Sequence, residues 1–290
     1  ITGNQKTERQ VIVREMGLQV GQPLPYDRVD AAWDHLEDLG YFSFVEIEYD
    51  DSEPGEVVLR VRVEEDLTTL YGPKIRHDRR HKYLLGGWLE QVNFRGKGET
   101  LSFSAIVYRI QRGRAAWTKP WLFGVEGLES RLSVSGEQAN FVFRPTRYRK
   151  WRAGLSLRWN VWRAAFVRGD GHLGAFTTRD SYVRPAVDRG PGTPSGSVRH
   201  ATGTRAYSRL GLAVGVDSRD NPWYPLQGWY GEFQTACWRS DDFADYCTFS
   251  LDARGFVPLP WKHILAVRAY GRRTDGPAYL DDVLFWGGVN

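Results

Sequence analysis

The first 40 residues show the hydrophobic spacing of two short helices. In residues 7–17, TERQVIVREMG, a capping box at Thr7–Gln10 predicts a helix start, and Gly17 predicts its end. A second helix is predicted between Pro25 and Gly40, because apolar residues recur there at intervals of three and four. The residues of this apolar stripe are Val29, Ala32, Trp33, Leu36 and Leu39.

Two strands are predicted after these helices. Residues 42–50, FSFVEIEYD, and residues 56–66, EVVLRVRVEED, alternate between apolar and charged positions, and the turn DDSEPGE between them predicts a hairpin. With residues 1–3 as the remnant of an earlier strand, the element order is β-α-α-β-β. We therefore expect an α+β module over residues 1–66, with two helices on a small sheet.

From residue 82 onward, alternation with a period of two dominates the chain. The clearest runs are residues 151–162, WRAGLSLRWNVW, residues 204–217, TRAYSRLGLAVGVD, and residues 247–255, CTFSLDARG. One face of each run is mainly apolar, and the other carries mostly charged or small polar residues. Runs of about 9 to 12 residues suit tilted strands that cross a bilayer. A soluble β-sandwich also alternates, but its strands are usually shorter, so we predict an antiparallel transmembrane β-barrel.

Composition favours a barrel over a helical membrane protein. No run of apolar residues is long enough for a membrane helix, and the mean hydropathy is −0.48. The chain has 12 Trp, 14 Tyr and 14 Phe, and such amphipathic rings suit the boundary between lipid and water. The net charge of +4 is a weak indication of phosphate-rich partners. Ile1 as the first residue and Met16 as the only methionine indicate a processed or trimmed piece.

Proline and glycine mark the connections between the predicted strands. Proline belongs at strand ends because it cannot donate a hydrogen bond to the sheet. The prolines that interrupt alternating runs are Pro120, Pro222, Pro225, Pro258 and Pro260. Residues 183–203 are rich in Gly, Pro and Ser and predict a surface loop.

Residues 1–66 resemble a polypeptide-transport-associated (POTRA) domain. The shared motifs are a Gly-Asn pair at the first strand, an Arg-Glu pair before a G-x-x-x-G loop, and L-x-x-x-G-Y-F before the second strand. In this chain the motifs are Gly3-Asn4, Arg14-Glu15, Gly17 with Gly21, and Leu36 with Gly40-Tyr41-Phe42.

Three turns resemble the barrel half of the same family, the outer-membrane assembly and translocation proteins of the BamA/TamA type. In these proteins POTRA domains precede a 16-stranded barrel. The turn markers in this chain are Gly96, Gly98, Glu99 and Thr100; Pro120, Trp121 and Gly124; and Asp217, Arg219, Asp220, Asn221, Pro222, Pro225, Gly228 and Trp229. We expect the last group to form a turn on the periplasmic side.

The resemblance also predicts the domain organisation. A POTRA domain is expected at residues 1–66, a linker at 67–81 and the N-terminal part of a transmembrane β-barrel at 82–290. The residues after 66 can supply about 10 or 11 strands, so the barrel is expected to be C-terminally incomplete.

The resemblance implies insertion, assembly or translocation of polypeptides in the outer membrane of a Gram-negative-type bacterium, with the POTRA domain in the periplasm. An organellar outer membrane is the less favoured location. Unfolded outer-membrane or secreted polypeptides are the implied clients. Outer-membrane lipid or lipopolysaccharide, accessory lipoproteins and further upstream POTRA domains are other implied partners. A secretion pore for one specific protein and a passive channel or structural protein remain alternatives.

Two strand edges are expected to act on clients. The POTRA edge would pair with an extended client by β-augmentation, either through the strand remnant at Ile1 or through Phe44, Val45, Glu46, Ile47, Glu48 and Tyr49. The first barrel strand would form a lateral seam through Tyr83, Leu84, Leu85, Gly86, Gly87, Trp88 and Leu89. Gly86-Gly87 would either weaken pairing at this seam or serve close packing.

Cys237 and Cys247 flank the polar stretch WRSDDFADY. If this stretch is a hairpin loop, the two cysteines lie at opposite positions on adjacent strands and could form a disulfide in an oxidising compartment. Two free thiols packed as small hydrophobic groups are the alternative.

No enzymatic site can be singled out. GKGET at residues 96–100 lacks the spacing of a phosphate loop, and His77 and His81, four positions apart, are interpreted as part of a solvated linker. RYRKWR at residues 147–152 suits a charged strand end at a headgroup boundary. Residues 254–256, Arg-Gly-Phe, match a family loop motif only literally, because they continue an alternating strand. We expect no enzyme activity, cofactor, metal site or nucleic-acid partner.

Overall fold

The chain divides into two compact units. One unit holds residues 1–72, 88–103 and 117–120, and the other holds residues 73–87, 104–116 and 121–290. The computed structural model describes residues 1–18, 20–24, 26–53, 56–78, 82–140, 147–162, 164–178, 182–184, 198–200, 203–221, 224–240, 243–260 and 263–275.

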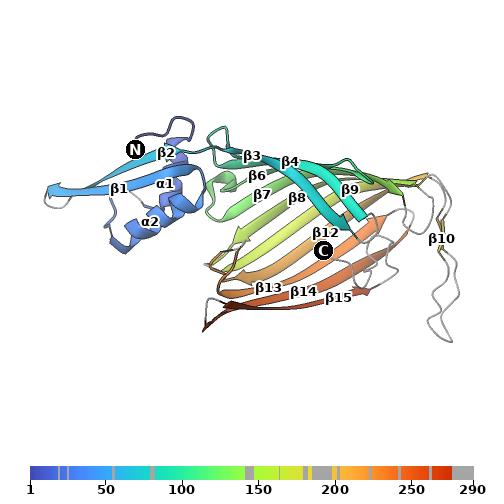
Figure 1. Ribbon diagram of the computed structural model, residues 1–290. Coiled ribbons are helices and arrows are strands. Elements are labelled where there is room, and N and C mark those ends of the chain that lie inside the picture. Colours follow the sequence, from blue (N-terminus) through green and yellow to red (C-terminus); the bar gives the residue numbers. More distant parts are fainter. Residues whose placement is uncertain are drawn as a thin grey trace. The chain divides into compact units, whose positions relative to one another are not determined.

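The first unit contains a small α+β module over residues 1–66. Helices α1 (Arg9–Met16) and α2 (Tyr26–Asp38) are followed by strands β1 (Phe42–Glu53) and β2 (Glu56–Glu65), which pair antiparallel. Thr2 adds a parallel bridge to Arg62 of β2. The predicted β-α-α-β-β order is confirmed (Figure 1). Among the described residues, neither helix nor any other is long and apolar enough to cross a membrane.

One apolar core joins the helices to a face of β1 and β2. Its buried members are Val11, Ile12, Met16, Ala32, Leu36, Tyr41, Phe42, Val45, Val61 and Val63. Full burial of an aliphatic side chain of this size stabilises a fold by roughly 1.5–3 kcal/mol. The apolar positions that recur along α2 therefore hold this helix against the sheet.

Helix α1 does not begin with the predicted capping box. It begins at Arg9 after Glu8, whose side chain makes no capping hydrogen bond. The hydroxyl of Thr7 instead accepts a hydrogen bond of 2.8 Å from Nδ2 of Asn93. Gly17 ends the helix in the left-handed conformation with φ of 63°, as the sequence predicts.

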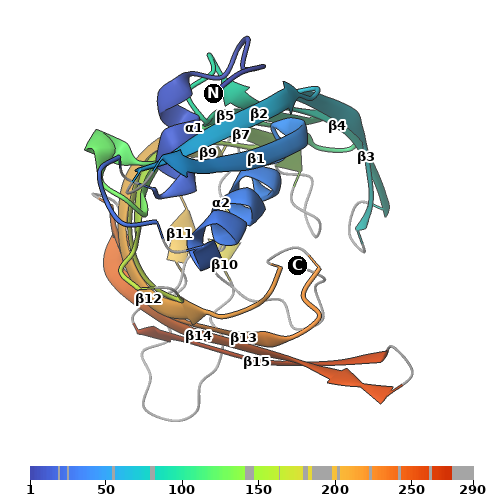
Figure 2. The same cartoon turned by 90° about the vertical axis from the view of Figure 1, so that its left-hand side faces the viewer.

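An 11-stranded sheet follows the module, and its strands run in sequence order from β3 at one edge to β15 at the other. Its strands are β3 (Thr69–Asp78), β4 (Lys82–Phe94), β5 (Glu99–Ile106), β6 (Gln111–Lys119), β7 (Leu128–Asn140), β8 (Arg147–Asn160), β9 (Ala165–Thr178), β12 (Gly203–Asp217), β13 (Gly228–Ser240), β14 (Phe243–Leu259) and β15 (His263–Asp275). Strands β10 (Tyr182–Arg184) and β11 (Val198–His200) pair with each other. Figures 1 and 2 show β12 to β15 side by side in a curved wall.

The expectation of a linker at residues 67–81 is wrong for most of that segment, because Thr69–Asp78 forms strand β3 of the large sheet. The hydrophobic pattern does not predict this strand, because Pro73 interrupts it and its polar residues do not alternate cleanly. Proline is tolerated in an edge strand, where an N–H can face away from the neighbouring strand, and β3 is an edge strand.

The two faces of the large sheet differ in chemistry. On β12, the side chains of Leu210, Leu212 and Val214 are 73%, 50% and 46% exposed on one face. On the other face, Arg209 of β12 forms an ion pair with Asp170 of β9. Long strands with an exposed apolar face and a charged opposite face are typical of transmembrane barrels.

Candidate functional site

Strand β1 is the open edge of the small sheet. The N–H of Thr2 donates to the carbonyl of Val61 at 2.9 Å, and the N–H of Val63 donates to the carbonyl of Thr2 at 3.0 Å. The backbone groups of Val61 and Val63 therefore point away from β1. Their partners on β1, Ile47 and Val45, form non-hydrogen-bonded pairs, so the N–H and C=O of these two residues point outward from the sheet.

Trp33 of α2 occupies part of this edge. Its indole Nε1 donates to the carbonyl of Val45 at 2.9 Å, which is independent support for the outward direction of that carbonyl. The outward backbone groups of Ile47 have no partner among the described residues. The edge that can accept another strand therefore begins at Ile47.

The six residues expected to bind clients all lie on β1, at this open edge. They are Phe44, Val45, Glu46, Ile47, Glu48 and Tyr49. The register places only Val45, Ile47 and Tyr49 with their backbone groups directed outward, because alternate residues bond to β2. Client binding at these residues stays a prediction.

The turn between β4 and β5 packs against the α+β module within the first unit. Asn93, with φ of 51°, donates from Nδ2 to the Thr7 hydroxyl at 2.8 Å, and its Oδ1 accepts the N–H of Gly98 at 2.9 Å. The hydroxyl of Tyr41 donates to the carbonyl of Gly98 at 3.2 Å. Burial raises the pKa of Tyr41 to about 12, with a further contribution from the Glu15 carboxylate. This turn is therefore fixed by buried polar groups from three separate segments.

The glycines of this turn meet the module at very close range. The carbonyl of Gly96 accepts the N–H of Glu8 at 2.8 Å, and Gly96 has φ of 72°. A Cβ at Gly96 would clash with the carbonyl of Lys6. The Glu99 side chain that follows is buried and accepts Nε1–H of Trp117 at 3.1 Å. The G-x-G-E turn marker is thus explained by close approach and by a buried carboxylate.

Glu65, the last residue of β2, fixes the segment before α1. Its carboxylate accepts the N–H of Lys6 at 2.9 Å and the N–H of Thr7 at 2.6 Å. Partial burial opposes its ionisation, but the hydrogen bonds from Thr7 and Lys6 outweigh burial and lower the pKa of Glu65 below its ordinary value of 4.5. The ionised carboxylate therefore stabilises this segment.

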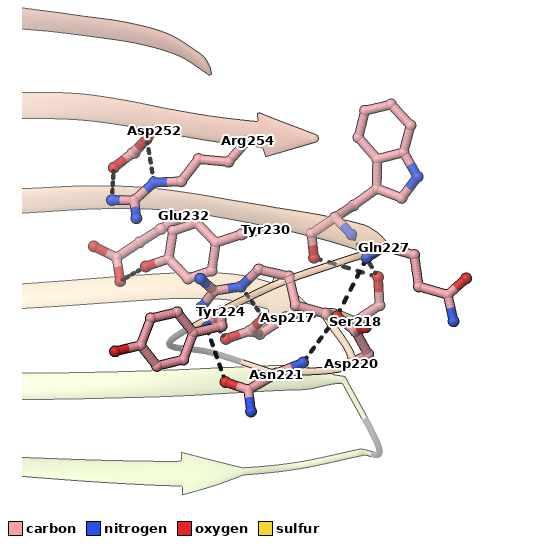
Figure 3. Close-up of polar contacts among 12 residues, drawn as sticks. Asp217, Ser218, Asp220, Asn221, Tyr224, Gln227, Tyr230, Glu232, Asp252 and Arg254 are labelled. Atoms are coloured by element: carbon pink, nitrogen blue, oxygen red, sulfur yellow. Dashed lines mark hydrogen bonds and ion pairs between the residues drawn. The ribbon is translucent and has the colours of Figure 1, made fainter. Parts of the chain in front are cut away.

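Asp220 organises the turn between β12 and β13 (Figure 3). Its Oδ1 accepts the N–H groups of Asn221 at 2.9 Å, Leu226 at 3.0 Å and Gln227 at 3.3 Å. Oδ1 of Asn221 in turn accepts the N–H of Tyr224 at 3.0 Å. The side chains of Asp220 and Asn221 thus supply the hydrogen-bond acceptors that the backbone N–H groups of this turn would otherwise lack.

A charged and aromatic cluster lies beside this turn. Arg219 makes two hydrogen bonds of 2.7 Å to the Asp217 carboxylate in a bidentate arrangement. The guanidinium carbons of Arg219 and Arg254 lie 4.9 Å and 5.1 Å from the Tyr230 ring. The Tyr230 hydroxyl donates to Glu232 at 2.9 Å, as Figure 3 shows. These contacts join three neighbouring strands on the charged face of the sheet.

The other turn markers have separate places. Pro120 follows β6, and Trp121 and Gly124 lie in left-handed conformations around the short helix at Leu122–Gly124. The N–H of Gly124 donates to the carbonyl of Trp121 at 2.9 Å. Pro225 and Gly228 lie in the β12–β13 connection and at the start of β13. Pro222 lies outside the described residues.

The expected seam residues do not lie at a sheet edge. Tyr83, Leu84, Leu85, Gly86, Gly87, Trp88 and Leu89 lie on β4, which has β3 on one side and β5 on the other. The expectation that this segment is the first strand is therefore wrong, because β3 precedes it. A Cβ at Gly86 would clash with the carbonyl of Ala105 on β5, so this glycine serves close packing.

Cys237 and Cys247 are joined by a disulfide. They lie directly opposite each other on β13 and β14, with their Cα atoms 4.1 Å apart. Residues 254–256 lie within β14, so the literal Arg-Gly-Phe is part of a strand, as expected. Among the described residues, no cluster of three or more His, Cys, Asp or Glu could hold a metal ion.

Both parts of the chain match known protein families. Residues 1–66 match the POTRA family, described as a surface antigen variable number repeat, and residues 93–274 match the Omp85 superfamily domain. The chain belongs to the Omp85 superfamily. As a member of this superfamily it is a bacterial outer-membrane β-barrel protein and not an enzyme. No curated protein sequence matches the chain.

Solved Omp85-type structures share the fold. BamA from Haemophilus ducreyi lacking POTRA domains 1–3 is similar with a TM-score of 0.71 and 17% identity, over 94% of this chain and 54% of that chain. CdiB from Acinetobacter baumannii is similar with a TM-score of 0.53 and 13% identity, over 95% of this chain and 51% of that chain. CdiB from Escherichia coli is similar with a TM-score of 0.54 and 13% identity, over 92% of this chain and 52% of that chain. The chain therefore spans about half the length of these structures, and the likeness concerns the fold alone.

Two contacts of the site are not predicted by the sequence. Trp33 belongs to the apolar stripe of α2, but its indole N–H reaches the edge of β1. Asn93 and Thr7 lie far apart in the sequence, and only the fold brings them together. The one signal in the sequence was Asn93 itself, since asparagine close to the glycine-rich segment R-G-K-G at residues 95–98 favours a left-handed turn position.

Proposed function

We propose that this chain forms part of an outer-membrane protein that inserts, assembles or translocates polypeptide clients. The supporting observation is the outward N–H and C=O of Ile47 on the open edge of β1. Backbone groups at such an edge can bind an extended client without requiring one particular sequence, as a protein that handles many unfolded chains needs.

The proposed mechanism has two steps. In the first, a client segment adds to β1 as a further strand of the small sheet. In the second, the edge strand β3 offers its unpaired side to the client, because an edge strand is a template for β pairing. This second role replaces the seam expected on β4. The side chains of Tyr71 and Ile75 on β3 are 78% and 71% exposed, so a client could also contact side chains of this strand.

A liposome assay with two matched variants tests this function. The full-length protein is reconstituted into liposomes, and folding of an added client barrel is followed by its heat-modifiable mobility in gels. Ile47→Pro removes the outward N–H while leaving the β1–β2 hydrogen bonds in place, because Ile47 does not bond to β2. Ile47→Ala loses similar packing but keeps the N–H. We expect the wild type and Ile47→Ala to accelerate client folding, and Ile47→Pro to lose most of this acceleration.

Other outcomes identify the alternatives. Equal folding rates in empty and protein-containing liposomes would contradict the proposal. A large steady conductance that does not depend on a client would indicate a passive channel. Export of a single partner through the pore, with no effect on other clients, would indicate a dedicated secretion pore.

A further inference from the structure

Charge is strongly divided between the two parts of this chain. Residues 1–66 contain six Lys and Arg against sixteen Asp and Glu, a net charge of −10. Residues 67–290 contain thirty-three Lys and Arg against nineteen Asp and Glu, a net charge of +14. The overall charge of +4 hides this division. An acidic module would attract basic clients and repel acidic ones.

Two of these carboxylates lie on the open edge strand without a partner. Glu46 and Glu48 project from the face of β1 opposite the apolar core, and neither has an ion-pair partner among the described residues. The nearby arginines of β2 are engaged elsewhere. Arg60 pairs with Asp50 at 3.2 Å, and Arg62 lies 3.6 Å from Glu64.

Helix α2 contributes acidic residues on the other side of the same edge. Trp33 marks the side of the helix that reaches β1, through its hydrogen bond to Val45. Asp30 and Glu37 lie one turn before and one turn after Trp33, so they share this side, and both are exposed. A strand added to β1 would therefore have carboxylates near both of its faces.

We propose that the open edge of β1 selects extended segments that carry Lys or Arg at alternate positions, and that pairing begins at Ile47 because Trp33 holds the carbonyl of Val45. This inference rests on the proposed function, in which β1 binds clients as an added strand. Basic side chains on one face of such a segment lie opposite Glu46 and Glu48, at the spacing of cross-strand pairs. Trp33 sets the end of the pairing register.

Peptide binding separates the selectivity from the strand addition itself. Three short labelled peptides alternate valine with lysine, threonine or glutamate, and fluorescence anisotropy measures their binding to the protein in neutral detergent. We expect the lysine peptide to bind about tenfold more tightly than the glutamate peptide at low salt, from two cross-strand pairs. Salt should narrow this difference. Equal binding of all three would overturn the selectivity alone, whereas binding by none would contradict strand addition and with it the proposed function.

Matched variants place the effect on this edge. Glu46→Gln with Glu48→Gln should remove most of the preference for lysine. The control, Asp38→Asn with Glu56→Gln, changes the net charge equally at exposed sites away from Trp33 and should keep the preference. An equal loss of the lysine preference in both double variants would show that the net charge of the module, and not the edge of β1, selects the peptide.

A third variant tests the role of Trp33. Trp33→Phe keeps an aromatic ring but removes the N–H that binds the carbonyl of Val45. One further backbone pair becomes available, so we expect two- to fivefold tighter binding of the neutral threonine peptide. Unchanged or weaker binding, in a variant with wild-type thermal stability, would overturn the assignment of Trp33 as the end of the register.

Discussion

The side-chain amide of Asn93 donates to the hydroxyl of Thr7 at 2.8 Å, across 86 positions of sequence. Both residues are buried, with 5% and 2% of their surface exposed. The same amide accepts the N–H of Gly98 through Oδ1. One side chain thus holds the β4–β5 turn in shape and also ties this turn to the segment before α1.

Replacing Asn93 by alanine should destabilise the first unit. Asn93→Ala removes two hydrogen bonds and leaves buried polar groups of Thr7 and Gly98 without partners, at a cost of about 2–4 kcal/mol. Urea unfolding followed by tryptophan fluorescence measures this loss. Asn93→Gly loses the same hydrogen bonds but tolerates φ of 51°, so it should be about 1 kcal/mol more stable than the alanine variant. A stability within experimental error of wild type for both variants would contradict the role given to this amide.

The stability of the α+β module should fall in acid through Glu65. The folded state lowers the pKa of this carboxyl, so its stabilisation is complete above the ordinary value of 4.5 and is lost as pH falls through the folded pKa. Thermal unfolding between neutral pH and pH 3 measures the effect. Glu65→Gln should be less stable at neutral pH and should show a smaller further loss below pH 4.5. A parallel pH profile for the two proteins would assign the acid sensitivity to other groups.

Asp220 should control local opening of the β12–β13 turn. Asp220→Ala removes the acceptor of three backbone N–H groups, and hydrogen exchange of Leu226 and Gln227 should become faster. Asp220→Asn retains an acceptor oxygen and should exchange more slowly than the alanine variant. The midpoint of global unfolding should stay nearly unchanged, because the turn is exposed. Wild-type exchange in Asp220→Ala would show that the loop holds its shape without this carboxylate.

Removing the Cys237–Cys247 disulfide should weaken the β13–β14 hairpin. A cross-link over 10 positions restricts a short loop in the unfolded chain, and the strand pairing already limits that loop, so we expect a loss of at most about 2 kcal/mol. Thermal unfolding of Cys237→Ser with Cys247→Ser measures it. Reduction of the wild type should give the same midpoint as the double variant. A larger loss on reduction than on substitution would point to a second effect of the reductant.

Local patterns predicted most of the fold. The helical spacing of α2, the alternation along β8 and β12 and the glycines of the β4–β5 turn each depend on neighbours in sequence, and the structure contains all of these elements. Strand β3 was missed because its membership of the sheet depends on pairing with β4, while Pro73 and scattered charges obscure its alternation.

Side-chain partners in the site were harder to predict than strands. Thr7 has the position of a capping residue, yet its hydroxyl bonds to Asn93, because the fold brings a buried amide beside it. Trp33 has the position of a core residue, yet it is 38% exposed and bonds to a strand edge. In both cases the local preference is overridden by a contact between distant segments.

The bridge between Thr2 and Arg62 has a consequence for how many chains the small sheet can engage. Thr2 occupies the outward backbone groups of Val61 and Val63, so no second strand can pair with β2 along the part that lies opposite Val45 and Ile47. At this level the small sheet can therefore take one added strand, on β1, and cannot hold a client on each side and so cross-link two of them.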